Sequence, residues 1–346
     1  MRFSNELATS SEAQKVSSME LLQIFAQNLV SPAILFFGLG ITAGLLKSDL
    51  DVPESISRYL SIYLMMAIGF KGGVAMAGTP SLSVALILTL GAGLAMSLLQ
   101  PFLGYSLLKA TTSLDRPTLA AIAGTYGSVS IVTFVTATSF LTTSGVVYEG
   151  YMVAVLALME APAILAALFI AHRSAPETIT AGKEAAPKLS REIFTNGAIL
   201  LLFGSFLIGW LSGKPGLDKM EGFLVTPFQG ILALFMLDMG IIVSRQLHHM
   251  RSFTFPLAWF GIYMPLIGAA AGLMLSYLIG LDAGTGALFM VLCASASYIA
   301  VPAAMRLALP QAKAAIFVPM SLAITFPFNI VVGIPIYLLM AERVLL

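Results

Sequence analysis

The chain has 346 residues, of which 58% are hydrophobic and only 10% are Asp, Glu, Lys or Arg. A soluble domain carries roughly a quarter charged residues, and at a mean hydropathy of +0.93 this chain lacks the polar side chains to cover a water-exposed surface. This composition disfavours a soluble enzyme, a nucleic-acid-binding protein and a disordered scaffold, and a net charge of +1 indicates no anionic macromolecular partner. It predicts an all-α polytopic membrane protein.

Ten apolar segments follow a polar N-terminal segment, 1–23, and a bilayer crossing needs about 20 such residues. The segments are 24–46, 54–76, 81–108, 118–140, 146–171, 194–212, 225–246, 254–280, 284–306 and 314–341. The longest connection, 172–193, is polar and rich in Ala, Pro, Thr and Lys, which is typical of a linker. It separates two five-helix halves, 24–171 and 194–341, and a short tail, 342–346, ends the chain.

The distribution of basic residues predicts the orientation. Alternate loops carry twelve Lys and Arg residues on one side and five on the other, and the richer side of a membrane protein is cytoplasmic. We therefore expect the linker in the cytoplasm and both termini outside, in a multi-pass protein of a bacterial inner membrane.

Because each half has five spans, two homologous halves must insert in opposite orientations. Three short matches support this inverted repeat. Ser128 and Ser130 of the fourth span align with Ser295 and Ser297 of the ninth. Glu160-Ala-Pro162 aligns with Thr325-Phe-Pro327, and Met66-Ala-Ile-Gly69 aligns with Leu237-Asp-Met-Gly240.

The small residues in the fourth and ninth spans predict that these two helices are discontinuous. A broken helix exposes N–H groups at one half-helix end, which favour an anion, and carbonyls at the other, which favour a cation. Two breaks that cross at mid-membrane would form a site for a small anion and a coupling cation. The alternative is ordinary close packing, with the serine hydroxyls bonded to helix carbonyls.

Three charged residues, Lys71, Glu160 and Asp238, lie well inside spans. A charge costs several kcal/mol there unless it is paired or hydrated, so each is a candidate functional residue. Glu160 precedes Pro162, which leaves a carbonyl without its helical donor, so that carboxylate and carbonyl can face a cation together. Lys71 and Asp238 either pair with each other or lie near an interface.

No catalytic constellation is visible in the spans. His172, His248 and His249 all fall at or beyond span ends, Cys293 is the only cysteine, and no metal-binding spacing occurs. We therefore expect no enzyme activity and no cofactor.

Five stretches carry a resemblance to a known family. They are Val52-Pro-Glu-Ser-Ile-Ser57, Ile68-Gly-Phe-Lys-Gly-Gly-Val-Ala75, Gly124 to Ser130, Ala294 to Arg306 and Ala308-Leu-Pro-Gln-Ala312. Together they make the chain, from Ser31 to Tyr337, resemble the sodium-dependent bicarbonate permease family, whose best-known members are cyanobacterial. The resemblance implies ten spans in two inverted repeats, gate and core domains, a homotrimer in the lipid bilayer, and Na+-coupled bicarbonate uptake.

The resemblance also implies a site. The family's substrate region maps onto two runs, Gly127, Ser128, Val129 and Ser130, and Ser295, Ala296, Ser297 and Tyr298. The acidic-x-Pro pattern of the fifth span falls on Glu160, and the Thr-Pro pattern of the tenth falls on Thr325. Na+, the only metal expected, is assigned to Glu160 and Thr325, with Ser130, Ser297 and Asp238 as further candidates.

Two departures from the family matter. Cyanobacterial members carry Ser-Ser-Ser-Asp in the ninth span, where this chain has Ser295-Ala-Ser-Tyr298. The lost carboxylate weakens the assignment of both cation and substrate. The linker is also shorter than in those proteins, where this region helps to bind a PII-like regulatory protein, so binding of such a partner is open.

Our hypothesis from the sequence is a secondary active transporter that imports bicarbonate, or a similar small anion, with Na+ by alternating access. The nearest alternative is a transporter of the same fold for another small anion, with Na+ or H+ coupling. An alternative of another class is a membrane sensor that binds the anion without moving it.

Overall fold

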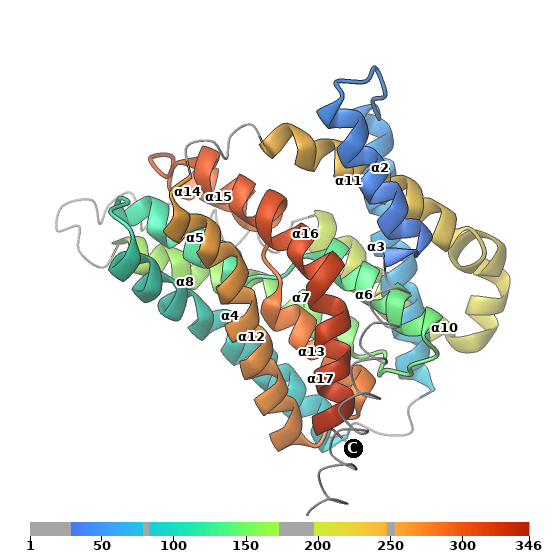
Figure 1. Cartoon of the computed structure of the whole chain (residues 1–346). Helices are drawn as coiled ribbons and strands as arrows, with labels where there is room; N and C mark the ends of the chain where they lie inside the picture. Colours follow the sequence, from blue (N-terminus) through green and yellow to red (C-terminus); the bar gives the residue numbers. More distant parts are fainter. Residues whose placement is uncertain (1–28, 79–82, 173–196, 248–252, 346) are drawn as a thin grey trace, which may run out of the picture.

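The computed structural model describes residues 29–78, 83–172, 197–247 and 253–345, and every regular element within these ranges is a helix (Figure 1). The helices in chain order are α2 (Pro32–Leu45), α3 (Glu54–Ala77), α4 (Val84–Thr111), α5 (Arg116–Gly127), α6 (Ile131–Thr143), α7 (Met152–Leu158), α8 (Glu160–His172), α10 (Gly197–Met220), η1 (Glu221–Val225), α11 (Phe228–Leu247), α12 (Phe255–Ile279), α13 (Ala283–Ala294), α14 (Ala300–Ala308), α15 (Ala314–Pro319), η3 (Met320–Thr325), α16 (Phe326–Phe328), η4 (Asn329–Gly333) and α17 (Ile334–Val344). The predicted N-terminal segment 1–23 and the linker after His172 lie outside the described residues.

The prediction of an all-α multi-pass membrane protein is confirmed. Eight helical stretches in the described part of the chain are long and apolar enough to cross a membrane, and the shorter helices α2 and α13 are apolar as well. Two predicted bounds are wrong. Helix α7 begins at Met152 rather than 146, because the chain turns at Gly145 with a φ of 72° and continues as a loop. Helix α10 extends beyond 212 to Met220, past a kink at Gly213, so the charged residues after the kink stay helical.

The helices form two groups. Helices α2, α3, α10 and α11 pack together, α3 against α10 and α11, and α2 against α11; we call them the four-helix unit (Figure 1). The remaining helices form the larger unit, in which α4, α5 and α8 pack together and α13 packs against α12 and α17. Within the four-helix unit α2 and α11 cross closely, since a Cβ atom added at Gly240 would lie 2.2 Å from the carbonyl oxygen of Phe37.

The two halves share one local arrangement. The Asp115 side chain caps α5 by accepting from the Thr118 N–H at 3.2 Å, and Asp282 caps α13 by accepting from the Thr285 N–H at 2.9 Å. The two threonine hydroxyls then accept backbone N–H bonds from the opposite half. Thr118 accepts from Lys313 at 3.1 Å, and Thr285 accepts from Glu149 at 3.0 Å.

The fourth and ninth spans are discontinuous, as predicted. The fourth consists of α5 and α6, separated by an extended backbone at Ser128 and Ser130. The ninth consists of α13 and α14, separated by residues 295–299. Helices α5 and α13 each have 12 residues and an aspartate at the N-terminal cap, and the break begins at the next residue, Ser128 or Ser295. The two breaks therefore lie at the same distance from the start of their spans.

Candidate functional site

The two helix breaks are joined to each other by hydrogen bonds. The backbone N–H of Ser297 donates to the carbonyl of Thr125 at 2.8 Å. In the other direction, the N–H of Ser130 donates to the Ser295 hydroxyl at 3.1 Å, and that hydroxyl donates to the carbonyl of Leu292 at 3.0 Å. A buried backbone group needs a hydrogen-bond partner, and inside the membrane water does not provide one. The two breaks therefore stabilise each other's extended backbone.

Ser130 caps the second half-helix of the fourth span, and Ser297 bonds to the first turn of the second half-helix of the ninth. The Ser130 hydroxyl accepts from the Thr133 N–H at 3.2 Å, at the start of α6, and the Ser297 hydroxyl accepts from the Val301 N–H at 3.3 Å, in the first turn of α14. In the described part of the chain, the N–H groups of Ile131 and Val132 have no partner, as is usual in a first helical turn. The start of α6 thus directs unpaired N–H groups and the positive end of a helix dipole toward the breaks.

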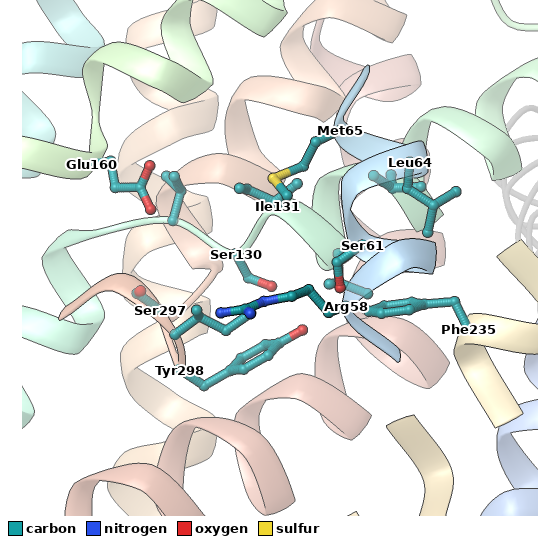
Figure 2. Close-up of a pocket in the computed structure, with 14 residues that line it drawn as sticks. Arg58, Ser61, Leu64, Met65, Ser130, Ile131, Glu160, Phe235, Ser297 and Tyr298 are labelled. Carbon is teal, nitrogen blue, oxygen red and sulfur yellow. The ribbon is translucent and has the colours of Figure 1, made fainter. Parts of the chain in front are cut away.

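A cavity of about 230 Å³ lies at these half-helix ends, between the four-helix unit and the larger unit. We call it the Arg58 cavity. It is lined by Arg58, Ser61, Leu64, Met65, Val129, Ser130, Ile131, Val132, Val135, Glu160, Phe235, Ser297, Tyr298 and Ile299. Helix α3 forms one wall, and the two breaks and the start of α6 form the other (Figure 2).

Arg58 is the residue that the sequence analysis missed, since it was counted only among the basic residues of a loop. It lies in the first turns of α3, and Figure 2 shows its guanidinium directed into the cavity toward Ser130, Ser297 and Tyr298. Among the described residues Arg58 has no ion-pair partner. The cavity therefore contains an unpaired guanidinium beside Ser130 and Ser297.

Two buried hydroxyls at the breaks lack a partner among the described residues. They are the hydroxyls of Ser128 and Tyr298. The Tyr298 ring is held edge-on against Phe326, with ring centroids 5.5 Å apart, so its hydroxyl reaches the Arg58 cavity in a fixed position. An unpartnered buried hydroxyl costs free energy, so Tyr298 has a donor available for a bound molecule.

Glu160 lies at the edge of the same cavity, away from Arg58 (Figure 2). It is only 3% exposed, and no hydrogen bond or ion pair from another described residue reaches its carboxylate. Helix α7 ends at Leu158 and α8 begins at Glu160. Because Pro162 has no N–H, the Leu158 carbonyl at this junction lacks a helical donor.

The predicted site residues divide into three groups. Val129, Ser130, Ser297, Tyr298 and Glu160 line the Arg58 cavity. Gly127, at the end of α5, and Ser128, Ser295 and Ala296, in the breaks, are buried and do not line it.

Thr325 and Asp238 form the third group and do not line the cavity. The Thr325 hydroxyl donates to the Gly261 carbonyl at 2.7 Å and lies 2.7 Å from the Tyr126 hydroxyl, so it is satisfied within the packed core. The Asp238 carboxylate accepts from the Ser57 hydroxyl. Lys71 lies over the ring of Phe228 instead of pairing with Asp238.

Two polar side chains missed by the sequence analysis stabilise the end of α13. The Gln100 amide donates to the Cys293 carbonyl at 2.9 Å, and the Asn329 amide donates to the Ala294 carbonyl at 2.9 Å. Tyr337 donates to the Asn329 side-chain oxygen at 2.9 Å. Each of these two carbonyls at the end of α13 therefore accepts a hydrogen bond from a distant helix.

Comparison with known proteins gives the family. A family model described as the Na+-dependent bicarbonate transporter superfamily matches residues 32–342, which is nearly the whole chain. The comparison with curated proteins found no match. A match of this extent, on a helical membrane protein with broken fourth and ninth spans, shows that the chain belongs to the Na+-dependent bicarbonate transporter superfamily.

Proposed function

We propose that this protein carries bicarbonate across the membrane together with Na+, by alternating access between the four-helix unit and the larger unit. The observation that carries the proposal is the Arg58 cavity, in which a guanidinium faces two crossed helix breaks. The protein would lie in a bacterial inner membrane as a homotrimer, with both termini outside and the linker in the cytoplasm.

The chemistry of the cavity favours a small oxyanion. Guanidinium groups bind planar carboxylate-like anions through two parallel hydrogen bonds. Ser130 and Ser297 lie beside Arg58, and the free N–H groups of Ile131 and Val132 add backbone donors. The hydroxyl of Tyr298 is a further donor. Bicarbonate has one planar carbon and three oxygens, which these converging donors can bind, and a cavity of about 230 Å³ also has room for a cation.

Glu160 supports a coupling cation in the same cavity. A nearly buried carboxylate without a protein partner is stabilised when a cation binds to it. The Leu158 carbonyl at the same junction, which Pro162 leaves without a helical donor, is an oxygen of the kind that Na+ prefers. Na+ beside Glu160 would in turn favour the anion near Arg58. Thr325 and Asp238 bond elsewhere, so we assign the cation to Glu160 and its junction.

The same carboxylate favours one alternative. Without an ion-pair partner among the described residues, Glu160 can carry a proton as well as a sodium ion, so H+ coupling is the second candidate.

Uptake of labelled bicarbonate by proteoliposomes tests this function. We expect an inward Na+ gradient to drive accumulation of bicarbonate above its external concentration, and a proton gradient without Na+ to drive none. Accumulation with a proton gradient alone would replace Na+ by H+ as the coupling ion. Saturable bicarbonate binding in detergent without any uptake would instead identify an anion sensor and contradict transport.

A further inference from the structure

A second cavity, of about 340 Å³, lies along the same helices as the Arg58 cavity. We call it the Lys71 cavity. It is lined by Ile68, Lys71, Gly72, Val74, Ala75, Thr138, Ser139, Thr142, Tyr148, Gly150, Val153, Leu217, Phe228 and Gln229. The sequence analysis named Lys71 but gave it no part in a site.

The two cavities are lined by successive parts of the same three helices, α3, α6 and α11. On α3 the Arg58 cavity ends at Met65 and the Lys71 cavity begins at Ile68. On α6 the change falls between Val135 and Thr138, in the same chain direction. On α11, which runs in the opposite direction, the order is reversed: Phe228 and Gln229 line the Lys71 cavity, and Phe235 lines the Arg58 cavity. The two cavities therefore lie at opposite ends of one interface between the four-helix unit and the larger unit.

An apolar layer separates the cavities. Ile68 is 5% exposed, Val135 is 1% exposed and Leu232 is fully buried, and all three belong to one hydrophobic cluster. A hydrated anion cannot cross such a layer without losing its water, because transfer of a charge into apolar surroundings is costly. In this conformation the layer is a closed barrier between the Arg58 cavity and the Lys71 cavity.

The Lys71 cavity has the chemistry of an anion site. The Lys71 ammonium lies 4.5 Å from the centroid of the Phe228 ring, a cation–π contact that holds the charge at the wall. None of the described residues that line this cavity carries a carboxylate, and none of them forms an ion pair with Lys71.

A second donor is oriented in the same cavity. The Gln229 side-chain oxygen accepts from the Ser139 hydroxyl at 3.0 Å, which leaves the amide N–H groups of Gln229 available. Ser139 and Gln229 also line a neighbouring cavity of about 570 Å³, so the Lys71 cavity adjoins a larger space at that end of the interface.

We propose that the Lys71 cavity is a second binding site for a small monovalent oxyanion, a vestibule that concentrates the cargo on the side of the barrier opposite Arg58. This inference rests on the proposed function, because the cargo is the same anion. Lys71 and Gln229 bind it by charge and amide donors, and it reaches the Arg58 cavity when the apolar layer opens.

The test replaces Lys71 by Cys and restores the charge chemically. We expect Lys71→Cys to lower bicarbonate uptake at subsaturating concentration on the order of tenfold, because a fixed charge in a cavity raises the local anion concentration. Modification with an aminoethyl thiosulfonate, which returns an ammonium on a side chain slightly longer than lysine, restores uptake. Modification with a sulfonatoethyl thiosulfonate, which adds a negative charge, does not.

Two controls separate the vestibule from other causes. Lys109→Cys removes an exposed lysine at the end of α4 and is expected to leave uptake unchanged. The native Cys293 is buried, so treated wild-type protein measures any background modification. Normal uptake by Lys71→Cys, or equal rescue by both reagents, would overturn the vestibule while transport by the wild-type protein stands. Absence of wild-type transport would reject the proposed function itself.

Discussion

Arg58→Gln is expected to lower bicarbonate uptake at subsaturating substrate by about 30-fold. A hydrogen bond to a charged group contributes roughly 2 kcal/mol, which is about 30-fold in affinity. The guanidinium is the only charged donor among the described residues that line the Arg58 cavity. Most of the loss is expected as an increase in KM, and Arg58→Lys, which keeps the charge but loses the paired donors, is expected to retain part of the affinity.

Arg245→Gln is the matched control. It removes the same charge from the same four-helix unit, also at an exposed position, but Arg245 is paired with Asp51 at 2.8 Å and does not line the cavity. Such surface pairs contribute at most about 1 kcal/mol, so uptake by this variant should equal that of the wild type. If Arg58→Gln and Arg245→Gln had the same effect, Arg58 would act through general surface charge and not as a ligand of the anion.

Glu160→Gln is expected to abolish the dependence of uptake on Na+. The amide keeps the size of the side chain and one oxygen but removes the negative charge that holds the cation. The ratio of uptake with Na+ to uptake without Na+ should therefore fall to about one, a complete loss of coupling of the kind expected when an intramembrane charge is removed. The measurement is the initial rate of uptake over a series of Na+ concentrations at constant ionic strength.

Glu221→Gln is the matched control, because it makes the same change at an exposed carboxylate at the start of η1. Uptake by this variant should depend on Na+ as in the wild type. A Glu160→Gln variant that retains the full Na+ dependence would exclude Glu160 as the cation ligand. A variant that loses dependence on a proton gradient instead would assign proton coupling to Glu160.

The sequence predicted the helix breaks because the cause of each break is local. Ser128 and Ser130, like Ser295 and Ser297, interrupt an apolar helix with small hydroxyl side chains, and the capping residues Asp115 and Asp282 precede both breaks at the same spacing. Local chemistry of this kind is visible in one sequence, so the positions of the two breaks were predicted correctly.

The partners of the breaks were not predictable, because they come from helices distant in the chain. Arg58 precedes the first break by many residues, and in the sequence it is one more basic residue near a span end. Only the packing of α3 across from α6 places it in the cavity. For Thr325 the sequence pattern suggested a cation ligand, but helices distant in the chain provide its hydrogen-bond partners. Its hydroxyl bonds to the Gly261 carbonyl and the Tyr126 hydroxyl.

The partner of Asp238 was not predictable for the same reason. A carboxylate inside a span is costly unless it is paired, hydrated or protonated, and the sequence alone left the partner of Asp238 undecided between Lys71 and a coupling ion. In the structure the partner is the Ser57 hydroxyl, one residue before Arg58 on α3. Asp238 therefore holds the first turns of α3 against α11, next to the residue that faces the cavity.

The most direct test of the central claim is an experimental structure of the protein in lipid with bicarbonate and Na+, compared with one without either ion. The predicted result is anion density in the Arg58 cavity, within hydrogen-bond distance of the Arg58 guanidinium and the Tyr298 hydroxyl, and a cation beside Glu160. Anion density elsewhere, with the Arg58 cavity unchanged between the two structures, would contradict the account.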